Sequence, residues 1–168
     1  MWDLDKKKLG MVLKAAHGTG TGAVTPHSTI HGIKFLAGEP LLVSSGADNS
    51  IRTWIFDREN TEPRLLRQKS GHYKPIIGMK FYLTATQQYN IITASQDHDM
   101  RIFFPNPANI STPFSQGEGL YKQAKTNEVS LEVVKRNIVT DFDANNLYEK
   151  DWDNVISCHE GEFTAQTW

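Results

Sequence analysis

Apolar and polar positions alternate with a period of two in several short runs of the chain. In residues 51–56 and 100–103, an arginine lies between apolar neighbours. This alternation is typical of a strand that is buried on at least one face. Residues 41–43 and 89–92 are further β-prone runs, each followed by turn residues of the Ser, Gly or Asp type. The pattern therefore predicts short strands separated by turns.

A repeat underlies these strands. Residues 30–35 match residues 76–81 at an offset of 46 positions, sharing the pattern Ile-x-Gly-(Ile/Met)-Lys-Phe. Residues 48–54 match residues 97–103 at an offset of 49 positions. A period of roughly 20 to 50 residues indicates a repeat architecture, in which each unit is one supersecondary structure. The second unit is predicted to carry a short insertion relative to the first.

A weaker third copy is predicted near the end of the chain, with strands at residues 138–142, 154–158 and 163–168. Between the second and third copies, residues 105–137 are rich in Pro, Asn, Ser, Thr and Gln, which predicts a long exposed connection. Trp2 resembles the tryptophan that ends a strand in the first copy, so the chain is expected to begin within a repeat.

Composition places the chain among ordinary globular proteins. It has 168 residues, of which 39% are hydrophobic, and a formal net charge of -1. Global disorder and a whole-molecule attraction to nucleic acid or anionic lipid are therefore disfavoured. A single cysteine, Cys158, excludes an internal disulfide framework and fits a reducing compartment. No apolar run approaches the length of a membrane span, and the N-terminus lacks an apolar signal segment. We expect a soluble intracellular chain.

Repeats of this length, with four short strands and an aspartate turn before a strand that ends in tryptophan, resemble WD-type β-propeller blades. The predicted fold is therefore all-β, with about three four-stranded blades of an incomplete propeller. Blades are assigned to residues 1–104, a polar connection to residues 105–137, and a degenerate, truncated further blade to residues 138–168. Closed propellers typically have about four to eight blades. The predicted open edges imply either a part of a longer product or a partner that completes the ring.

The resemblance to WD blades implies a buried hydrogen-bonded network in each blade. Its members are a histidine from a Gly-His pair, a serine or threonine, the turn aspartate and the tryptophan. A buried carboxylate needs donors, and the histidine and the turn backbone can provide them. The matching positions are Ser44, Asp48 and Trp54 in the first copy and His72, Thr93 and Asp97 in the second.

Two details of this network stay open or depart from the pattern. His17 and His31 are both candidates for the histidine of the first copy. In the second copy Phe103 replaces the tryptophan, which removes an indole donor, so the contact to Thr93 is expected to be weaker. We expect all of these residues to hold the blades together and to bind no ligand.

Longer runs match one WD family more closely. Residues 46–57, 64–67, 70–72 and 92–97 resemble the WD-repeat subunit of the UTP-B subcomplex of the nucleolar small-subunit processome. Residues 151–161 and 167–168 resemble the following blade of that family. The resemblance covers most of residues 30–104 and 138–168. Members of the family are far longer, with two tandem propellers and a helical C-terminal region, so this chain corresponds to a central part.

The resemblance implies a non-catalytic scaffold in the nucleus and nucleolus that supports processing of the small-subunit ribosomal RNA precursor. Other processome proteins are the expected partners, and contact with pre-ribosomal RNA is expected to be indirect. The alternative is a WD-propeller substrate adaptor in signalling or ubiquitin ligation, because a fold alone does not determine function. No cofactor, metal, membrane or small-molecule substrate is expected, and no plausible acid, base or nucleophile constellation indicates an enzyme.

Five other features are interpreted as structural. Residues 18–22 lack the Lys-Ser or Lys-Thr that follows the glycines of a phosphate-binding loop. His27 and His31 have the spacing of a helical metal pair, but they lie in a predicted loop and strand. Cys158 and His159 would point to opposite faces of a strand and cannot share a proton. The glycosylation sequon at residues 109–111 is not expected to be used. Basic residues are interpreted as solvated surface charge rather than as an RNA site: Lys6, Lys7, Lys8, Arg64, Arg67 and Lys69.

Overall fold

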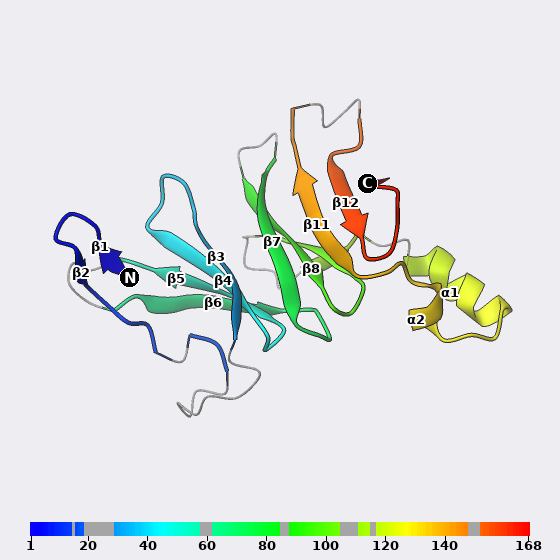
Figure 1. The fold of residues 1–168 in the computed structure, drawn as a ribbon, viewed down its shortest axis with the longest axis horizontal. Coiled ribbons are helices and arrows are strands. Elements are labelled where there is room, and N and C mark those ends of the chain that lie inside the picture. Colours follow the sequence, from blue (N-terminus) through cyan, green and yellow to red (C-terminus); the bar gives the residue numbers. More distant parts are fainter. Residues whose placement is uncertain are drawn as a thin grey trace. The chain divides into compact units, whose positions relative to one another are not determined.

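The structure is a computed structural model that describes residues 1–14, 16–18, 29–57, 62–84, 88–104, 111–114, 117–147 and 152–168. The chain divides into two units, Met1–Ser70 and Gly71–Trp168, and each is described by itself (Figure 1). Antiparallel strands form the described regular structure of the first unit and most of that in the second, which also contains two helices. The prediction of an all-β fold built from WD-type blades is confirmed.

The first unit contains one four-stranded sheet in which consecutive strands pair in the order β3-β4-β5-β6. Its strands are β3 (Ile30–Phe35), β4 (Leu41–Gly46), β5 (Ser50–Ile55) and β6 (Arg64–Ser70). A separate hairpin joins β1 (Trp2–Asp3) to β2 (Lys8–Leu9). Buried Leu42 and Trp54 pair across β4 and β5 and pack with Ala16, which gives this unit its small core.

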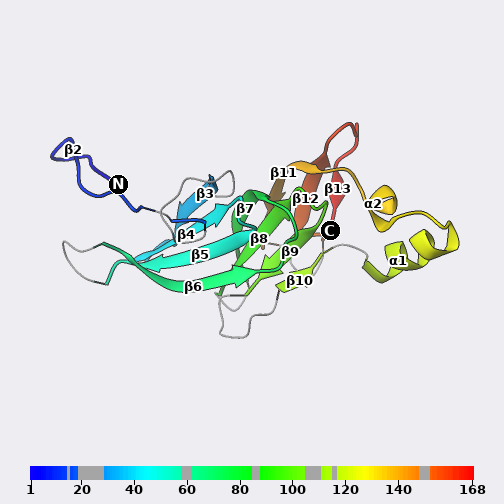
Figure 2. The same cartoon turned by 90° about the horizontal axis from the view of Figure 1, so that it is seen from below.

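The second unit contains two sheets. The four-stranded sheet has the order β10-β9-β8-β7, and the three-stranded sheet has the order β11-β12-β13. Figure 2 shows β10 beside β9 at the outer edge of the first of these sheets. Their bounds are β7 (Ile76–Leu83), β8 (Tyr89–Ser95), β9 (Met100–Phe103), β10 (Ser111–Pro113), β11 (Val139–Ala144), β12 (Val155–His159) and β13 (Gln166–Thr167).

Regular structure also occurs in residues 105–137, which the composition predicts as a polar connection. Strand β10 completes the second blade, and helices α1 (Gly117–Thr126) and α2 (Leu131–Val134) follow it. The sequence pattern did not predict these helices. Leu120 and Ala124 are four residues apart and therefore lie on one face of α1, where Ala124 is buried. We call residues 117–134 the helical insert.

A β-bulge recurs in the first strand of every sheet of three or more strands. The pairing register shifts between Ile30 and Gly32 in β3, between Ile76 and Gly78 in β7, and between Val139 and Asp141 in β11. A bulge inserts one extra residue and bends the strand. Gly78 also permits close packing, because a Cβ atom at this position would lie 2.9 Å from Cε1 of Phe142.

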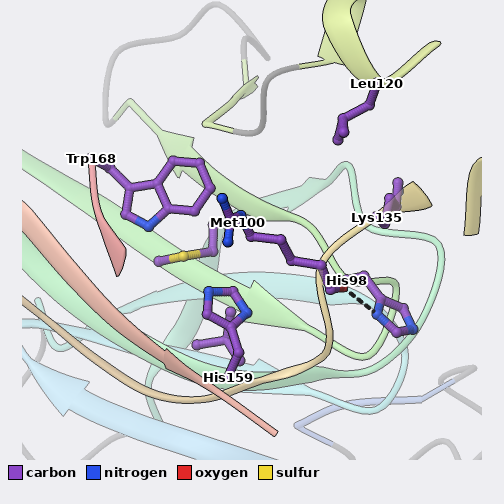
Figure 3. A pocket seen from close by; sticks show the side chains of 8 residues that line it. His98, Met100, Leu120, Lys135, His159 and Trp168 are labelled. Carbon is purple, nitrogen blue, oxygen red and sulfur yellow. Dashed lines mark hydrogen bonds between the residues drawn. The ribbon is translucent and has the colours of Figure 1, made fainter. Parts of the chain in front are cut away.

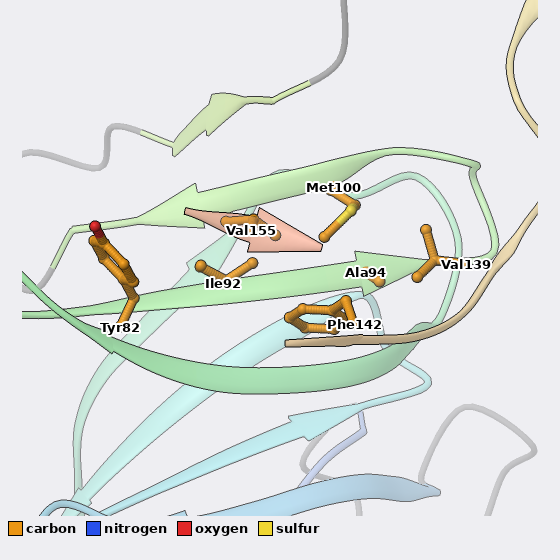
Figure 4. Packing of buried hydrophobic residues seen from close by; sticks show 7 residues of the cluster. All are labelled: Tyr82, Ile92, Ala94, Met100, Val139, Phe142 and Val155. Carbon is orange, nitrogen blue, oxygen red and sulfur yellow. The ribbon is translucent and has the colours of Figure 1, made fainter. Parts of the chain in front are cut away.

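The core of the second unit lies between its two sheets (Figure 4). Tyr82, Ile92, Ala94 and Met100 come from β7, β8 and β9, and the facing sheet contributes Val139, Phe142 and Val155. All seven side chains are buried. Burying a large apolar side chain contributes about 1.5 to 3 kcal/mol. This packing places β11 against β7, so the third sheet is held on the second blade by apolar contact.

Candidate functional site

The first unit contains a hydrogen-bonded network centred on His17. Its Nδ1 donates to Oδ1 of Asp48 at 2.8 Å, and its Nε2 lies 2.8 Å from Oγ of Ser44. The indole Nε1 of Trp54 donates to the same serine oxygen at 2.9 Å. Ser44, Asp48 and Trp54 are therefore brought together as one group. Of the two candidate histidines, His17 supplies the imidazole, whereas His31 is exposed on β3.

Asp48 accepts several further hydrogen bonds within this network. The backbone and hydroxyl of Ser50 donate at 3.2 and 2.8 Å, the Gly18 backbone at 3.2 Å, and Nη2 of Arg52 at 3.1 Å. Burial by itself would raise the pKa of the Asp48 carboxyl, but the hydrogen bonds from His17, Ser50 and Gly18 outweigh it and lower this pKa. The carboxylate is thus held in its ionised form.

Two residues shape the space that His17 occupies. Arg52 donates to the backbone carbonyls of Ala16 and Gly18 at 3.0 and 3.2 Å, which fixes the segment on both sides of the histidine. Gly46 leaves room for the ring, because a Cβ atom there would collide with Nδ1 of His17. The glycine is therefore required by the imidazole and not by the backbone conformation of the strand.

The second blade has a similar network around His72. Nδ1 of His72 lies 3.0 Å from Oδ2 of Asp97, and Nε2 lies 2.8 Å from Oγ1 of Thr93. Phe103 stands where the first unit has tryptophan and contributes a ring 6.0 Å from the His72 ring, measured between centroids. The Thr93 hydroxyl also lies 3.3 Å from the Arg101 carbonyl oxygen. His72, Thr93 and Asp97 are thus in contact without an indole donor.

Asp97 is more buried than Asp48, with side-chain exposures of 5% and 14% respectively. Backbone N–H groups of Tyr73 and Asp99 donate to its carboxylate at 2.9 and 3.0 Å. Burial would raise the pKa of Asp97, but the hydrogen bond and charge of His72, together with these N–H donors, hold it well below its ordinary value.

The residues after the turn aspartates adopt the left-handed conformation. Asn49 has φ 61° and His98 has φ 66°. This backbone region is uncommon for residues other than glycine, and asparagine, aspartate and histidine are enriched there. The two turns therefore repeat each other in backbone geometry as well as in their aspartates.

A third network lies in the last sheet and was not predicted as a group. Nε1 of Trp168 donates to Oγ of Ser157 at 2.8 Å, and Ser157 lies 3.0 Å from Nε2 of His159. Nδ1 of His159 lies 2.7 Å from the carbonyl oxygen of Asn137. A carbonyl only accepts, so Nδ1 carries the proton and donates. In the neutral ring, Nε2 then accepts from the Ser157 hydroxyl.

The signal for this third network was the spacing between serine and tryptophan. Ser44 and Trp54 are ten positions apart, and Ser157 and Trp168 are eleven apart. His159 lies two residues after its serine, which is the position of Gly46 in the first unit. Positions two apart share a face of a strand, so His159 fills from its own strand the space that His17 enters from a distant segment. Cys158, between Ser157 and His159 in the strand, is exposed.

The segment that follows the helical insert is tied to the second blade. Nζ of Lys135 lies 2.9 Å from Oδ1 of Asp99 and donates to the Asp97 carbonyl at 3.2 Å. Nδ1 of His98 donates to the carbonyl of Arg136 at 2.8 Å. Arg136 also lies 3.9 Å from Glu162, in the connection between β12 and β13 of the third sheet. These contacts connect both sheets to the exit of the insert.

A small cavity lies beside these contacts (Figure 3). Trp168, Met100 and His159 line one side, and His98 and Lys135 lie on the other. Its volume is about 30 Å³. That is roughly the volume that one molecule occupies in liquid water, so the cavity is too small for a cofactor or an organic substrate.

A larger cavity of about 220 Å³ runs along β7 and β11, where it is lined by residues that include Gly78, Lys80, Asp141 and Phe142. Lys80 on β7 pairs with two acidic residues of β11: its Nζ lies 3.8 Å from Asp141 and 3.2 Å from Asp143. All three groups are substantially exposed, so these ion pairs contribute little to stability.

Some of the weighed motifs cannot be placed. Residues 19–22, His27, residues 109–110 and Asp151 lie outside the described residues. Within the described ranges, no group of three or more His, Cys, Asp or Glu side chains could hold a metal ion. In that part of the chain, no helix combines the length and the apolar character that crossing a membrane requires.

The chain was compared with known proteins, and no family model matches it. Human WD repeat-containing protein 36 is 36% identical over 173 residues, covering 100% of this chain and 18% of the relative. The U3 small nucleolar RNA-associated protein 21 homolog of Schizosaccharomyces pombe is 36% identical over 167 residues, covering 99% of this chain and 17% of the relative. The U3 small nucleolar RNA-associated protein 21 of Saccharomyces cerevisiae is 29% identical over 178 residues, covering 99% and 18% respectively.

The chain thus spans less than a fifth of the length of these relatives. The similarity extends over essentially the whole chain and includes the blades and the helical insert. The blade geometry and this similarity together show that the chain belongs to the WD-repeat family that these three proteins represent.

Proposed function

We propose that this chain is part of a non-catalytic scaffold in the small-subunit processome, where it supports processing of the small-subunit ribosomal RNA precursor. The observation that carries the proposal is the whole-chain similarity to two proteins whose names describe them as associated with the U3 small nucleolar RNA. A nucleolar location within the nucleus and partnership with other processome proteins follow from the same proposal. Contact with pre-ribosomal RNA would then be indirect.

The state of the polar side chains supports a role without catalysis. The histidines of the three networks, His17, His72 and His159, each use both ring nitrogens in contacts within the protein. The hydroxyls of Ser44, Thr93 and Ser157 are buried. A nucleophilic hydroxyl must reach its substrate, and the burial of these three hydroxyls denies that access. These residues are therefore suited to holding blades together.

The division of the chain remains part of the proposal. Residues 1–104 would supply the blades, residues 105–137 a connection that includes the helical insert, and residues 138–168 a further blade. Repeat units of this kind contact mainly their neighbours, and their turns and connections are left to contact other molecules.

Affinity purification tests this function. The full chain, tagged and expressed in cells, is recovered from nuclear extract, and its partners are identified by mass spectrometry. We expect enrichment of processome proteins. U3 RNA should be recovered with them, and if its contact with the chain is indirect, its recovery should fall when the complexes are washed at high salt without nuclease. As a matched control, the Asp97→Ala variant should lose these partners in proportion to its loss of folded protein. Recovery of ubiquitin-ligase subunits without processome proteins would instead favour a substrate adaptor.

A further inference from the structure

The two four-stranded sheets end differently at their outer edges. Strand β10 has three residues and ends in Pro113, which cannot donate a backbone hydrogen bond. Strand β6 has seven residues and contains neither proline nor glycine. In the described part of the chain, no strand pairs with β6 on the side away from β5. A short edge with proline resists pairing, whereas a long regular edge can receive another strand.

A bulge determines which β6 side chains share a face. Thr53 pairs with Arg67 and Trp54 pairs with Leu65, so Leu66 is the extra residue. Because directly paired residues point to the same side of a sheet, the bulge turns Leu65 to the face opposite Arg67. Arg64 pairs with Ile55, two positions from Thr53, and Lys69 pairs with Ile51. The three basic residues Arg64, Arg67 and Lys69 therefore lie on one face.

The charges along this edge favour an acidic neighbour. Arg64 pairs with a carboxylate, that of Asp57, whose Oδ2 accepts from its Nη2 at 2.6 Å and from its Nε at 2.8 Å. Arg67 and Lys69 are two residues apart on the same face, and partial burial together with the charge of Arg67 lowers the pKa of Lys69. A carboxylate placed between two like charges relieves their repulsion.

Apolar surface accompanies these charges. Leu65 is 43% exposed and Leu66 is 39% exposed. On some edge strands, charged residues have no role other than preventing aggregation. That role does not require two exposed leucines beside them. The combination matches strand addition, in which backbone hydrogen bonds supply affinity and alternate side chains supply specificity.

We propose that the outer edge of β6 is a docking site for an extended segment of a partner protein, in which acidic residues alternate with apolar ones. The segment adds as a further strand of the first sheet. Its acidic side chains face Arg67 and Lys69, and its apolar side chains cover Leu65 and Leu66. This site is separate from the blade networks and does not depend on the proposed processome role.

The test uses a synthetic heptapeptide of alternating glutamate and valine, labelled with fluorescein and titrated with the full 168-residue chain. Fluorescence anisotropy reports binding. We expect saturable binding that weakens as salt is raised, because exposed ion pairs are screened. A peptide with lysine in place of glutamate should bind at least about tenfold more weakly. Alternate N–H groups of a strand point to opposite edges, so two glutamate–valine peptides are compared, one N-methylated at odd residues and one at even residues. The one methylated on the edge that faces β6 should lose binding, since it cannot complete the strand pairing.

Two protein variants locate the site. Arg67→Glu combined with Lys69→Glu should weaken binding of the glutamate–valine peptide by at least about tenfold. Lys122→Glu combined with Lys125→Glu makes the same change of net charge on exposed positions of α1 and should leave binding unchanged. If reversal at β6 reduces folding, as judged by circular dichroism, the milder pair Arg67→Gln and Lys69→Gln should give a smaller loss in the same direction.

Three outcomes would overturn the proposal. Absence of binding at millimolar peptide would show that the edge is closed to strands. Equal binding of the unmodified peptide and both N-methylated peptides would show attraction by charge without strand pairing. An equal loss in the α1 variant would show a general effect of net charge rather than a site on β6.

Discussion

The network around His17 in the first unit and the network around His72 in the second share an imidazole, a carboxylate and a hydroxyl. They differ in the aromatic residue. In both, an imidazole joins a turn aspartate to a hydroxyl on the neighbouring strand. Trp54 adds an indole donor to the first, whereas Phe103 adds only a ring to the second. The comparison teaches that the carboxylate and imidazole form the constant part, and that the aromatic position tolerates loss of its hydrogen bond.

The third sheet extends this comparison. Its network keeps the serine, the histidine and the tryptophan but has a backbone carbonyl where the other two have a carboxylate. An imidazole therefore joins a hydroxyl to an acceptor in all three cases, and the acceptor need not be charged.

The largest effect is expected for the carboxylate of the second network. Asp97→Ala should destabilise the second unit by about 3 kcal/mol, because it leaves the buried donors of His72, Tyr73 and Asp99 without their acceptor. Asp48→Ala should cost about 1 to 2 kcal/mol in the first unit, because Asp48 is more exposed. Urea unfolding followed by circular dichroism measures both, and equal costs would mean that burial does not distinguish the two networks.

The next effect concerns the space around His17. Gly46→Ala should destabilise the first unit by about 2 kcal/mol, because the added methyl group would collide with the imidazole. Thermal unfolding gives the change in stability, and Gly38→Ala is not a suitable control because Gly38 has a φ of 79°. Gly119→Ala has room, since a Cβ atom there meets nothing within 4 Å, and in helix α1 it should leave stability unchanged or raise it by up to about 1 kcal/mol. A stable Gly46→Ala variant would contradict the packing of His17.

Acid should weaken the second network over a wider pH range than the first. Both aspartates have lowered pKa values in the folded chain, so their stabilisation is complete above about pH 4, the ordinary carboxyl range. As pH falls below this, the unfolded chain takes up protons first and stability declines until the folded carboxyl also protonates. The pKa of Asp97 is lowered further than that of Asp48, so the total loss of stabilisation on acidification should be larger for the second network. Unfolding of the wild type and of Asp97→Asn measured from pH 6 to pH 2 would show this as a flatter profile for the variant.

The smallest effect is expected at the aromatic position. Trp54→Phe gives the first network the aromatic residue of the second and should cost about 1 kcal/mol, the value of one hydrogen bond to Ser44. Trp2→Phe, at a side chain that is 70% exposed, provides the control for loss of an indole. Chemical unfolding of both variants gives the difference. A cost above about 3 kcal/mol would indicate that the indole matters mainly through packing.

Much of the fold could be predicted because its signals are local. Alternation in residues 51–56 and 100–103 predicted strands, and β5 and β9 lie there. The repeat offset predicted that the two units would have equivalent strands, and even their bulges coincide. The helical insert was harder to predict, because its apolar positions are few and polar residues surround them.

The candidate network illustrates the same limit. Ser44, Asp48 and Trp54 could be chosen from spacing along one hairpin, because residues on paired strands are brought together by the strand period itself. The choice between His17 and His31 could not be made in this way. His17 reaches Asp48 from 31 residues away, through a segment whose path depends on Arg52 and on the space left by Gly46.

Sequence periodicity was thus sufficient for the strands, the turns and the repeat, since each depends on residues within one or two hairpins. Contacts between distant segments decided the rest. They include the packing of Val139 and Phe142 on the second blade, the ion pair between Lys135 and Asp99, and the hydrogen bond from His159 to the carbonyl of Asn137. These depend on which surfaces meet once the sheets have formed, and that information is spread over the whole chain rather than carried by any one pattern.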